Sequence, residues 1–208
     1  MISIGYRKLT VGDFYKILFD GMKVEIDPGA LRRVSENYEF LKEFAKGKVI
    51  YGINTGLGPM AQYKINGNRE LELQYNLIRS HASGCGAPLE DIYVKATMLA
   101  RLSTLIQARS GLHPEVVKLI MELINRDICP YIPEHGGVGA SGDLVQLAHL
   151  ALILIGEGEV SYKGQWRPTA EVFAEEGLTP ISMHIREGLG LINGTSAMTG
   201  IGMINVTH

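Results

Sequence analysis

The feature that most constrains the fold of this chain is a glycine-rich loop that leads directly into an apolar helix. The loop reads Gly136-Gly-Val-Gly-Ala-Ser-Gly-Asp143, and the segment before it contains Pro130 and Pro133. Two prolines so close together exclude a regular helix and a central strand from that segment. The helix predicted over 143–155 is apolar on most of its sides, which indicates burial all round. The backbone must therefore turn sharply beside the first turn of a core helix.

Helical patterns dominate the rest of the 208 residues. The predicted helices cover 13–20, 28–47, 69–83, 88–109, 114–126 and 169–177, and a proline opens three of them. The predicted strands are short: 23–26, 49–53 and a hairpin over 159–167. The apolar stretch from 186 onward reaches the last residue without a helix stop signal. We therefore expect a mainly α domain over residues 1–208 that is truncated before its last helix ends.

Composition and charge exclude several classes of function. The net charge of -2 leaves no basic footprint for nucleic acid and no polybasic stripe for a membrane surface. The longest apolar run, Leu150 to Ile155, is far too short to span a membrane, and the first ten residues lack a signal-peptide core. Cys85, Cys129 and the six histidines show no metal-ligand spacing. These observations predict a cytoplasmic protein with no bound metal.

Two familiar motifs and one plain structural interpretation compete for the glycine loop. Gly137, Gly139 and Gly142 match the dinucleotide fingerprint, but that motif needs a preceding strand in a βαβ unit, which the prolines exclude here. A P-loop has lysine where this chain has Asp143, and a carboxylate there repels phosphate. A plain structural interpretation makes Asp143 the N-cap of the following helix. That interpretation accounts for Asp143 but not for the density of glycines.

A chemical interpretation accounts for both. Flanking glycines let the backbone fold back so far that the amide nitrogen of Gly142 can attack the carbonyl carbon of Ala140. Loss of two waters, one of them from Ser141, then gives a five-membered ring with an exocyclic methylene group. That ring is a strong electrophile, and the helix N-terminus beside it would stabilise negative charge gathered during addition.

Residues 137–144 resemble the signature of the histidine and aromatic amino-acid ammonia-lyases, in which Ala-Ser-Gly becomes 4-methylideneimidazol-5-one (MIO). Three further segments resemble the family in the same order: 51–58, 76–84 and 191–196. One departure is Gln146, where the family signature commonly has proline. This glutamine and the segment 59–65 are similar to a subgroup of bacterial tyrosine ammonia-lyases.

The resemblance implies a fumarase/aspartase-like helical fold with a few short strands. Residues 1–208 would be the N-terminal catalytic domain that carries the MIO precursor, since family members are more than twice as long. Their active sites combine several subunits of a homotetramer, so we expect this piece alone to be inactive. The sequence gives Ala140, Ser141 and Gly142 as three separate residues, which leaves formation of the ring open.

The resemblance also assigns roles to individual residues. Tyr51 would be the base that removes the β-proton of the substrate, a role that requires hydrogen bonds or positive charge to stabilise the phenolate. Asn193 would contact the ring and the substrate amine. The residues alone favour a packed core aromatic at Tyr51, and Asn193 is consistent with a turn residue before Gly194.

Four more residues are candidate substrate contacts. Ser80 and His81 lie on the family helix that faces the substrate ring, and Gly58 and Leu144 would form pocket walls. The imidazole of His81 can hydrogen-bond a tyrosine hydroxyl or an imidazole nitrogen of the substrate. It disfavours phenylalanine as a substrate, because phenylalanine would leave the histidine unpaired. The alternative is a helix-face histidine bonded to the backbone.

The predicted activity is the loss of ammonia from L-histidine or L-tyrosine, which gives urocanate or p-coumarate. An aminomutase, in which the same site returns ammonia to the β-carbon, is an open alternative. A truncated protomer that only assembles with others is a second one. The sequence therefore predicts a small aromatic amino acid as the substrate and copies of the same chain as partners.

Overall fold

The computed structural model describes residues 1–65, 69–138 and 142–206, and helices make up most of its regular structure. The helices are α1 (Val11–Leu18), α2 (Pro28–Phe44), α3 (Arg69–His81), α4 (Asp91–Leu105), α5 (Pro114–Asn125), α6 (Leu144–Leu154), α7 (Thr169–Glu176), α8 (Glu187–Ile192) and α9 (Ser196–Asn205), with a 3-10 turn η1 (Gly58–Met60). The strands are β1 (Ile2–Ile4), β2 (Val24–Ile26), β3 (Cys85–Pro88), β4 (Cys129–Pro130), β5 (Pro133–His135), β6 (Glu159–Tyr162) and β7 (Gln165–Pro168). The predicted mainly α fold with a few short strands is confirmed.

The strands form three small sheets. β1 and β2 pair in parallel, β3 and β5 pair antiparallel, and β4, β6 and β7 form an antiparallel sheet in that order. The predicted hairpin is present, with Tyr162 opposite Gln165. Pro130 ends an edge strand and Pro133 begins one, as their missing N–H groups require.

Two local predictions from the sequence are wrong. Pro88 ends strand β3 opposite Pro133, and α4 begins only at Asp91, because pairing with β5 takes up the residues before it. Residues 49–53 form turns rather than a strand. In those turns the Asn54 side chain accepts a hydrogen bond from the Ile50 N–H and donates one to the Lys48 carbonyl. Local bonds of this kind satisfy the backbone without a strand partner.

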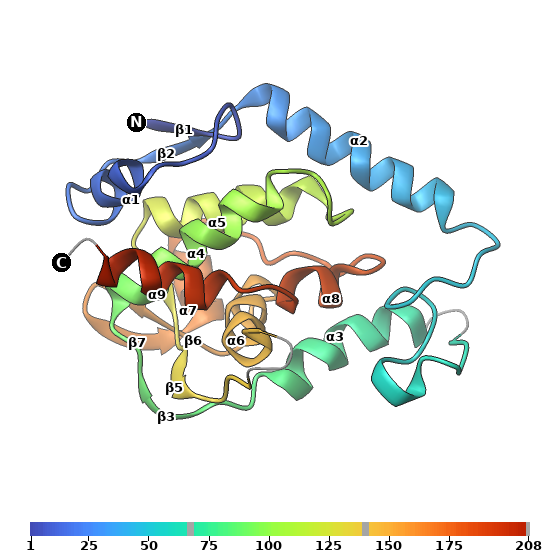
Figure 1. Cartoon of the computed structure of the whole chain (residues 1–208). Coiled ribbons are helices and arrows are strands. Elements are labelled where there is room, and N and C mark those ends of the chain that lie inside the picture. The colour runs from blue at the N-terminus through green and yellow to red at the C-terminus, as the bar shows by residue number, and fades with distance from the viewer. Residues whose placement is uncertain (66–68, 139–141, 207–208) are drawn as a thin grey trace.

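The core lies between α4, α5 and α6, with α9 packed along α4 (Figure 1). Helices α9 and α4 approach so closely that a Cβ at Gly200 would lie 2.6 Å from the backbone nitrogen of Thr97. Helix α6 is less completely buried than its sequence predicts. Its later residues are mostly buried, but Leu144, Val145 and Gln146 in the first turn are only partly covered. That opening lies where the glycine loop joins the helix.

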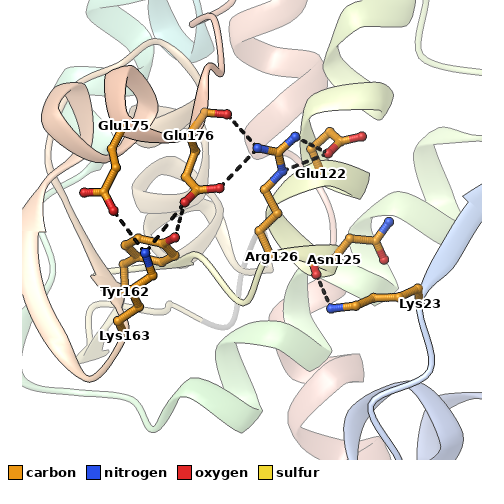
Figure 2. Close-up of polar contacts among 8 residues, drawn as sticks. All are labelled: Lys23, Glu122, Asn125, Arg126, Tyr162, Lys163, Glu175 and Glu176. Atoms are coloured by element: carbon orange, nitrogen blue, oxygen red, sulfur yellow. Dashed lines mark hydrogen bonds and ion pairs between the residues drawn. The ribbon is translucent and has the colours of Figure 1, made fainter.

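Polar contacts attach the hairpin and α7 to α5 (Figure 2). Arg126, which follows α5, donates to the Glu122 carboxylate at 3.0 Å and to the main-chain carbonyl of Glu176 at 2.7 Å. The hydroxyl of Tyr162 on β6 donates to the Glu176 carboxylate, and Lys163 pairs with Glu175 at 3.0 Å. These contacts position the outer elements and involve none of the predicted site residues.

Candidate functional site

The glycine loop is closed at both ends by backbone contacts. Gly142 forms an isolated antiparallel bridge with Val138 and a parallel bridge with Gly194, and the Asp143 N–H donates to the Gly194 carbonyl at 3.0 Å. Gly142 has φ +80°, and a Cβ there would lie 2.4 Å from the Gly194 oxygen, so only glycine fits. Ala140 and Ser141, the other two predicted precursor residues, lie outside the described part of the chain.

The arm that enters the loop lies against the first turn of α6. A Cβ at Gly136 would meet the Val145 side chain at 2.6 Å, and a Cβ at Gly137 would meet Nε2 of Gln146 at 2.8 Å. Gly136 also faces Gly84, which follows α3. The Gln146 Oε1 atom is buried and has no hydrogen-bond partner among the residues that the structure describes. The residue that departs from the family signature therefore packs directly on the loop.

Asp143 caps a different helix from the one that the sequence indicates. Its carboxylate makes no capping bond to α6 but accepts hydrogen bonds from the N–H groups of Ala197 at 2.8 Å and Met198 at 3.0 Å, at the start of α9. Asp143 is the N-cap residue of α6 by position, as the sequence indicates, but its side chain makes no capping bond to that helix. A carboxylate at the N-terminus of α9 stabilises the helix dipole and satisfies two otherwise free N–H groups.

Arg101 fixes the end of α8 from inside the core. The side chain, on α4, is 2% exposed and donates to the carbonyls of Gly190 at 2.5 Å and Asn193 at 3.1 Å. Burial lowers the pKa of Arg101 to about 10, against the opposing effect of the Asp143 carboxylate. Cationic donors at a helix C-terminus stabilise the free carbonyls there, so Arg101 sets the backbone position of Asn193.

Tyr51 lies in the turns before η1 and is 51% exposed, rather than packed in the core or on a strand. Its hydroxyl oxygen accepts a hydrogen bond from the N–H of Gly58 at 3.2 Å, which brings these two predicted site residues together. Because the oxygen is the acceptor, the hydroxyl proton points away from Gly58.

Ser80 and His81 end helix α3. His81 Nδ1 lies 2.9 Å from the Leu77 carbonyl oxygen, and the Ser80 hydroxyl donates to the same carbonyl at 3.2 Å. A carbonyl only accepts, so Nδ1 carries the hydrogen and Nε2 of the neutral ring keeps a lone pair. His81 is thus bonded to the backbone and still offers an acceptor.

The remaining predicted residues are placed by α6 and α8. Asn193 is the exposed C-cap residue of α8, and Leu144 is the first residue of α6 and is half-buried. The structure therefore joins Gly142 to the residue after Asn193, and pairs Tyr51 with Gly58 and Ser80 with His81. None of the hydrogen bonds among the described residues joins one of these groups directly to another. Their helices α3, α6 and α8 nonetheless pack against one another (Figure 1).

A hollow of about 580 Å³ adjoins the loop beside Gly142. Its other walls are Val138, Gln146 and the outward residues of α9, including Met198 and Ile201. Asp143 and Thr195 also line it, and of the described candidate residues only Gly142 does.

Sequence reasoning missed the buried polar residues that assemble this region, above all Gln74 and Arg101. Both contact partners about 90 to 115 positions later in the chain, and no local spacing signals such pairs. Within the described ranges, no group of three His, Cys, Asp or Glu residues is placed to hold a metal ion. No helix in those ranges is both long and apolar enough to cross a membrane.

Known proteins share both the sequence and this fold. A tyrosine 2,3-aminomutase from Chondromyces crocatus is 48% identical over 200 residues, which are 96% of this chain and 38% of that protein. A histidine ammonia-lyase from Shouchella clausii is 43% identical over 205 residues, which are 98% of this chain and 41% of that protein. The structure of the tyrosine aminomutase from Streptomyces globisporus superposes with a TM-score of 0.92 at 36% identity, over 99% of this chain and 39% of that one.

The chain thus spans about two fifths of the length of the curated relatives that it matches. Residues 9–208 match the family described as aromatic amino acid lyases, which is nearly the whole sequence. The match, the shared fold and the identities above agree. The chain belongs to the aromatic amino acid lyase family.

Proposed function

We propose that this chain contributes to the elimination of ammonia from L-histidine or L-tyrosine, which gives urocanate or p-coumarate. The observation that carries the proposal is the double closure of the loop at Gly142, which is bridged to Val138 on one side and to Gly194 on the other. The electrophile would form from Ala140, Ser141 and Gly142, with loss of two waters.

The described residues fit such a ring. Gly142 has no Cβ to obstruct its nitrogen, and its left-handed φ of +80° belongs to a sharp reversal of the chain. Helix α6 begins at Leu144, so its N-terminal dipole faces the loop. When formed, the ring supplies an electrophilic methylene that takes up the substrate, most simply through its amine, and makes the nitrogen a better leaving group.

The chain's own residues would bind the substrate and move its proton. Tyr51 would remove the β-proton, and the N–H of Gly58 donates to the oxygen that must carry the negative charge. Nε2 of His81 would accept a hydrogen bond from a tyrosine hydroxyl or an imidazole N–H. Phenylalanine offers no donor, so its rejection would be worth about 1–3 kcal/mol. Asn193, Ser80 and Leu144 complete the proposed contacts.

A specific observation also favours an aminomutase, because the 48% identical relative is a tyrosine 2,3-aminomutase. In that reaction ammonia would return to the β-carbon before the product leaves. Chromatography of the products separates the two functions, since a lyase gives an unsaturated acid and a mutase gives a β-amino acid. A homotetrameric assembly and a cytoplasmic location belong to the same proposal, supported by the family resemblance and the composition.

The test is the intact mass of the purified chain, followed by ultraviolet assays of the full-length enzyme with histidine, tyrosine and phenylalanine. We expect a deficit of two waters that maps to the peptide containing Ala140–Gly142. The Ser141→Ala variant is the matched control, because it lacks the hydroxyl that leaves as the second water. A full sequence mass in the unmodified chain would contradict ring formation in this chain.

A further inference from the structure

The buried side chain of Gln74 hydrogen-bonds to the three segments that carry Tyr51, His81 and Asn193. Gln74 lies on α3 and is fully buried. Its Nε2 donates to the Gly52 carbonyl and to the Glu70 carbonyl, both at 3.4 Å, and its Oε1 accepts from the Gly188 N–H at 3.0 Å. A single amide group thus connects the turn at Gly52, helix α3 and helix α8.

Both partners outside α3 are glycines at close approaches. A Cβ at Gly188 would lie 2.7 Å from the backbone oxygen of Gln74, and a Cβ at Gly52 would lie 2.5 Å from Cδ2 of Leu189. Gly52 also has φ +75°, which favours glycine. Gly52 therefore packs on the Leu189 side chain of α8, and Gly188 packs on the backbone of α3, with no space for a side chain at either glycine.

These contacts place the candidate residues relative to one another. Tyr51 directly precedes Gly52, Asn193 is the C-cap of the helix that contains Gly188, and His81 follows Gln74 on α3 by about two turns. The displacement of either glycine would move Tyr51 or Asn193 against His81.

We propose that Gln74 is a positioning residue for the reaction, one that holds Tyr51 and Asn193 in register with His81. The inference rests on the proposed function of those three residues. A glutamine suits the position because its amide offers both a donor and an acceptor at the end of one side chain. An ionised glutamate offers only acceptors, and methionine offers neither strong donor nor strong acceptor.

The test compares Gln74→Met, Gln74→Glu and the control Gln107→Met, all in the full-length enzyme, because this piece alone is expected to be inactive. Gln107 is exposed, and within the described part of the chain its Nε2 donates only to the nearby Ser103 carbonyl. Hydrogen–deuterium exchange is measured over residues 50–58 and 187–193, together with kcat and KM for histidine and tyrosine. For Gln74→Met we expect exchange in both segments to accelerate roughly tenfold, and kcat to fall by a similar factor with a smaller change in KM.

Gln74→Glu gives the sharper signature. Its oxygen still accepts from the Gly188 N–H, so residues 187–193 should stay protected while 50–58 exchange faster. Lowering the pH protonates the carboxyl and restores a donor for the Gly52 carbonyl, so protection of 50–58 should recover relative to the control. In an active enzyme, faster exchange throughout the chain, or an exchange pattern that does not depend on pH, would reject the positioning role of Gln74. Such a result would leave the proposed function standing. The expected exchange pattern in an enzyme that converts neither amino acid would reject the proposed function, and the catalytic part of this inference with it.

Discussion

The two turns that carry Asn193 and Tyr51 are built in opposite ways. Asn193 follows a short helix whose last carbonyls bind Arg101, a guanidinium that is 2% exposed. Tyr51 lies in a turn whose bonds are mostly local, such as those between Asn54 and the backbone at Ile50 and Lys48. Both side chains are exposed, but only the first turn is fixed by a buried charge.

The difference matters because a buried charge tolerates little movement. In a low-dielectric interior, displaced partners leave an unpaired cation and unpaired carbonyls, both of which are costly. The residues that follow Tyr51, from Gly52 to Gly56, are also buried, but neutral hydrogen bonds hold them, and the loss of a neutral bond costs less than the displacement of a buried charge. The fold of this chain therefore sets the backbone at Asn193 firmly and leaves the Tyr51 side chain at the surface.

The largest expected effect is on the firmly held turn. Arg101→Met removes both hydrogen bonds to the end of α8 and leaves two carbonyls without donors. We expect the free energy of unfolding to fall by about 3 kcal/mol, measured by urea denaturation. Arg32→Met is the control, because Arg32 is 77% exposed and makes only a 3.9 Å pair with Glu36, so its effect should stay within about 0.5 kcal/mol. Equal effects of the two variants would show that the buried guanidinium does not hold the turn.

The next effect separates backbone strain from steric contact in the glycine loop. Gly142→Ala adds a Cβ in a left-handed conformation and places it 2.4 Å from the Gly194 oxygen. Gly164→Ala adds one at nearly the same φ, +76°, with no atom within 4 Å. We expect losses in unfolding free energy of about 3 kcal/mol and about 1 kcal/mol respectively. If the losses were equal, the contact between Gly142 and Gly194 would contribute nothing.

The sequence predicts where helices begin better than it predicts turns and short strands. Pro28 and Pro114 begin helices as predicted, since a proline at the first helical position needs no hydrogen-bond partner. The segment 49–53 has the apolar character of a strand but forms turns, because Asn54 satisfies its backbone locally. Pro88 fails as a helix start because β5, some 45 residues later, pairs with its strand.

The sequence predicts the motifs of the candidate site but not the long-range contacts that bring them together. The glycine loop and its sharp reversal follow from residue types that permit few other conformations. The distant partners of Gln74 and Arg101 do not, because a buried glutamine or arginine has no local pattern that identifies a backbone N–H or carbonyl about 90 to 115 positions away. Asp143 illustrates the limit, since its carboxylate caps α9 rather than the helix that it precedes.

Acidification should weaken the contact between α3 and α6 before it affects either turn. His149 on α6 accepts the Gly84 N–H at Nε2, 3.2 Å away, and burial lowers the pKa of His149 below its ordinary value. The unfolded chain therefore takes up the proton first, so stability is complete above about pH 6.5 and falls as the pH drops through that value.

We expect a loss of about 1 kcal/mol between pH 7.5 and pH 5, roughly the contribution of one hydrogen bond, measured by urea unfolding at each pH. His113, whose pKa burial and the neighbouring His184 also lower, adds to the slope in the same direction. His149→Gln keeps an acceptor for the Gly84 N–H without a titrating group, so its profile should be flatter. An unchanged profile in that variant would assign the pH dependence elsewhere.

The smallest expected effect on stability is at Tyr51, and its smallness is informative. Tyr51→Phe removes one acceptor for the exposed Gly58 N–H, which water replaces, so the free energy of unfolding should change by less than about 0.5 kcal/mol. If Tyr51 is the base of the proposed reaction, the same substitution in the full-length enzyme abolishes the product signal of the ultraviolet assay. A variant that is stable and inactive would assign the hydroxyl to chemistry. A variant that is destabilised as much as Arg101→Met would show that the Tyr51 turn is as firmly held as the Asn193 turn, and the contrast between them would not stand.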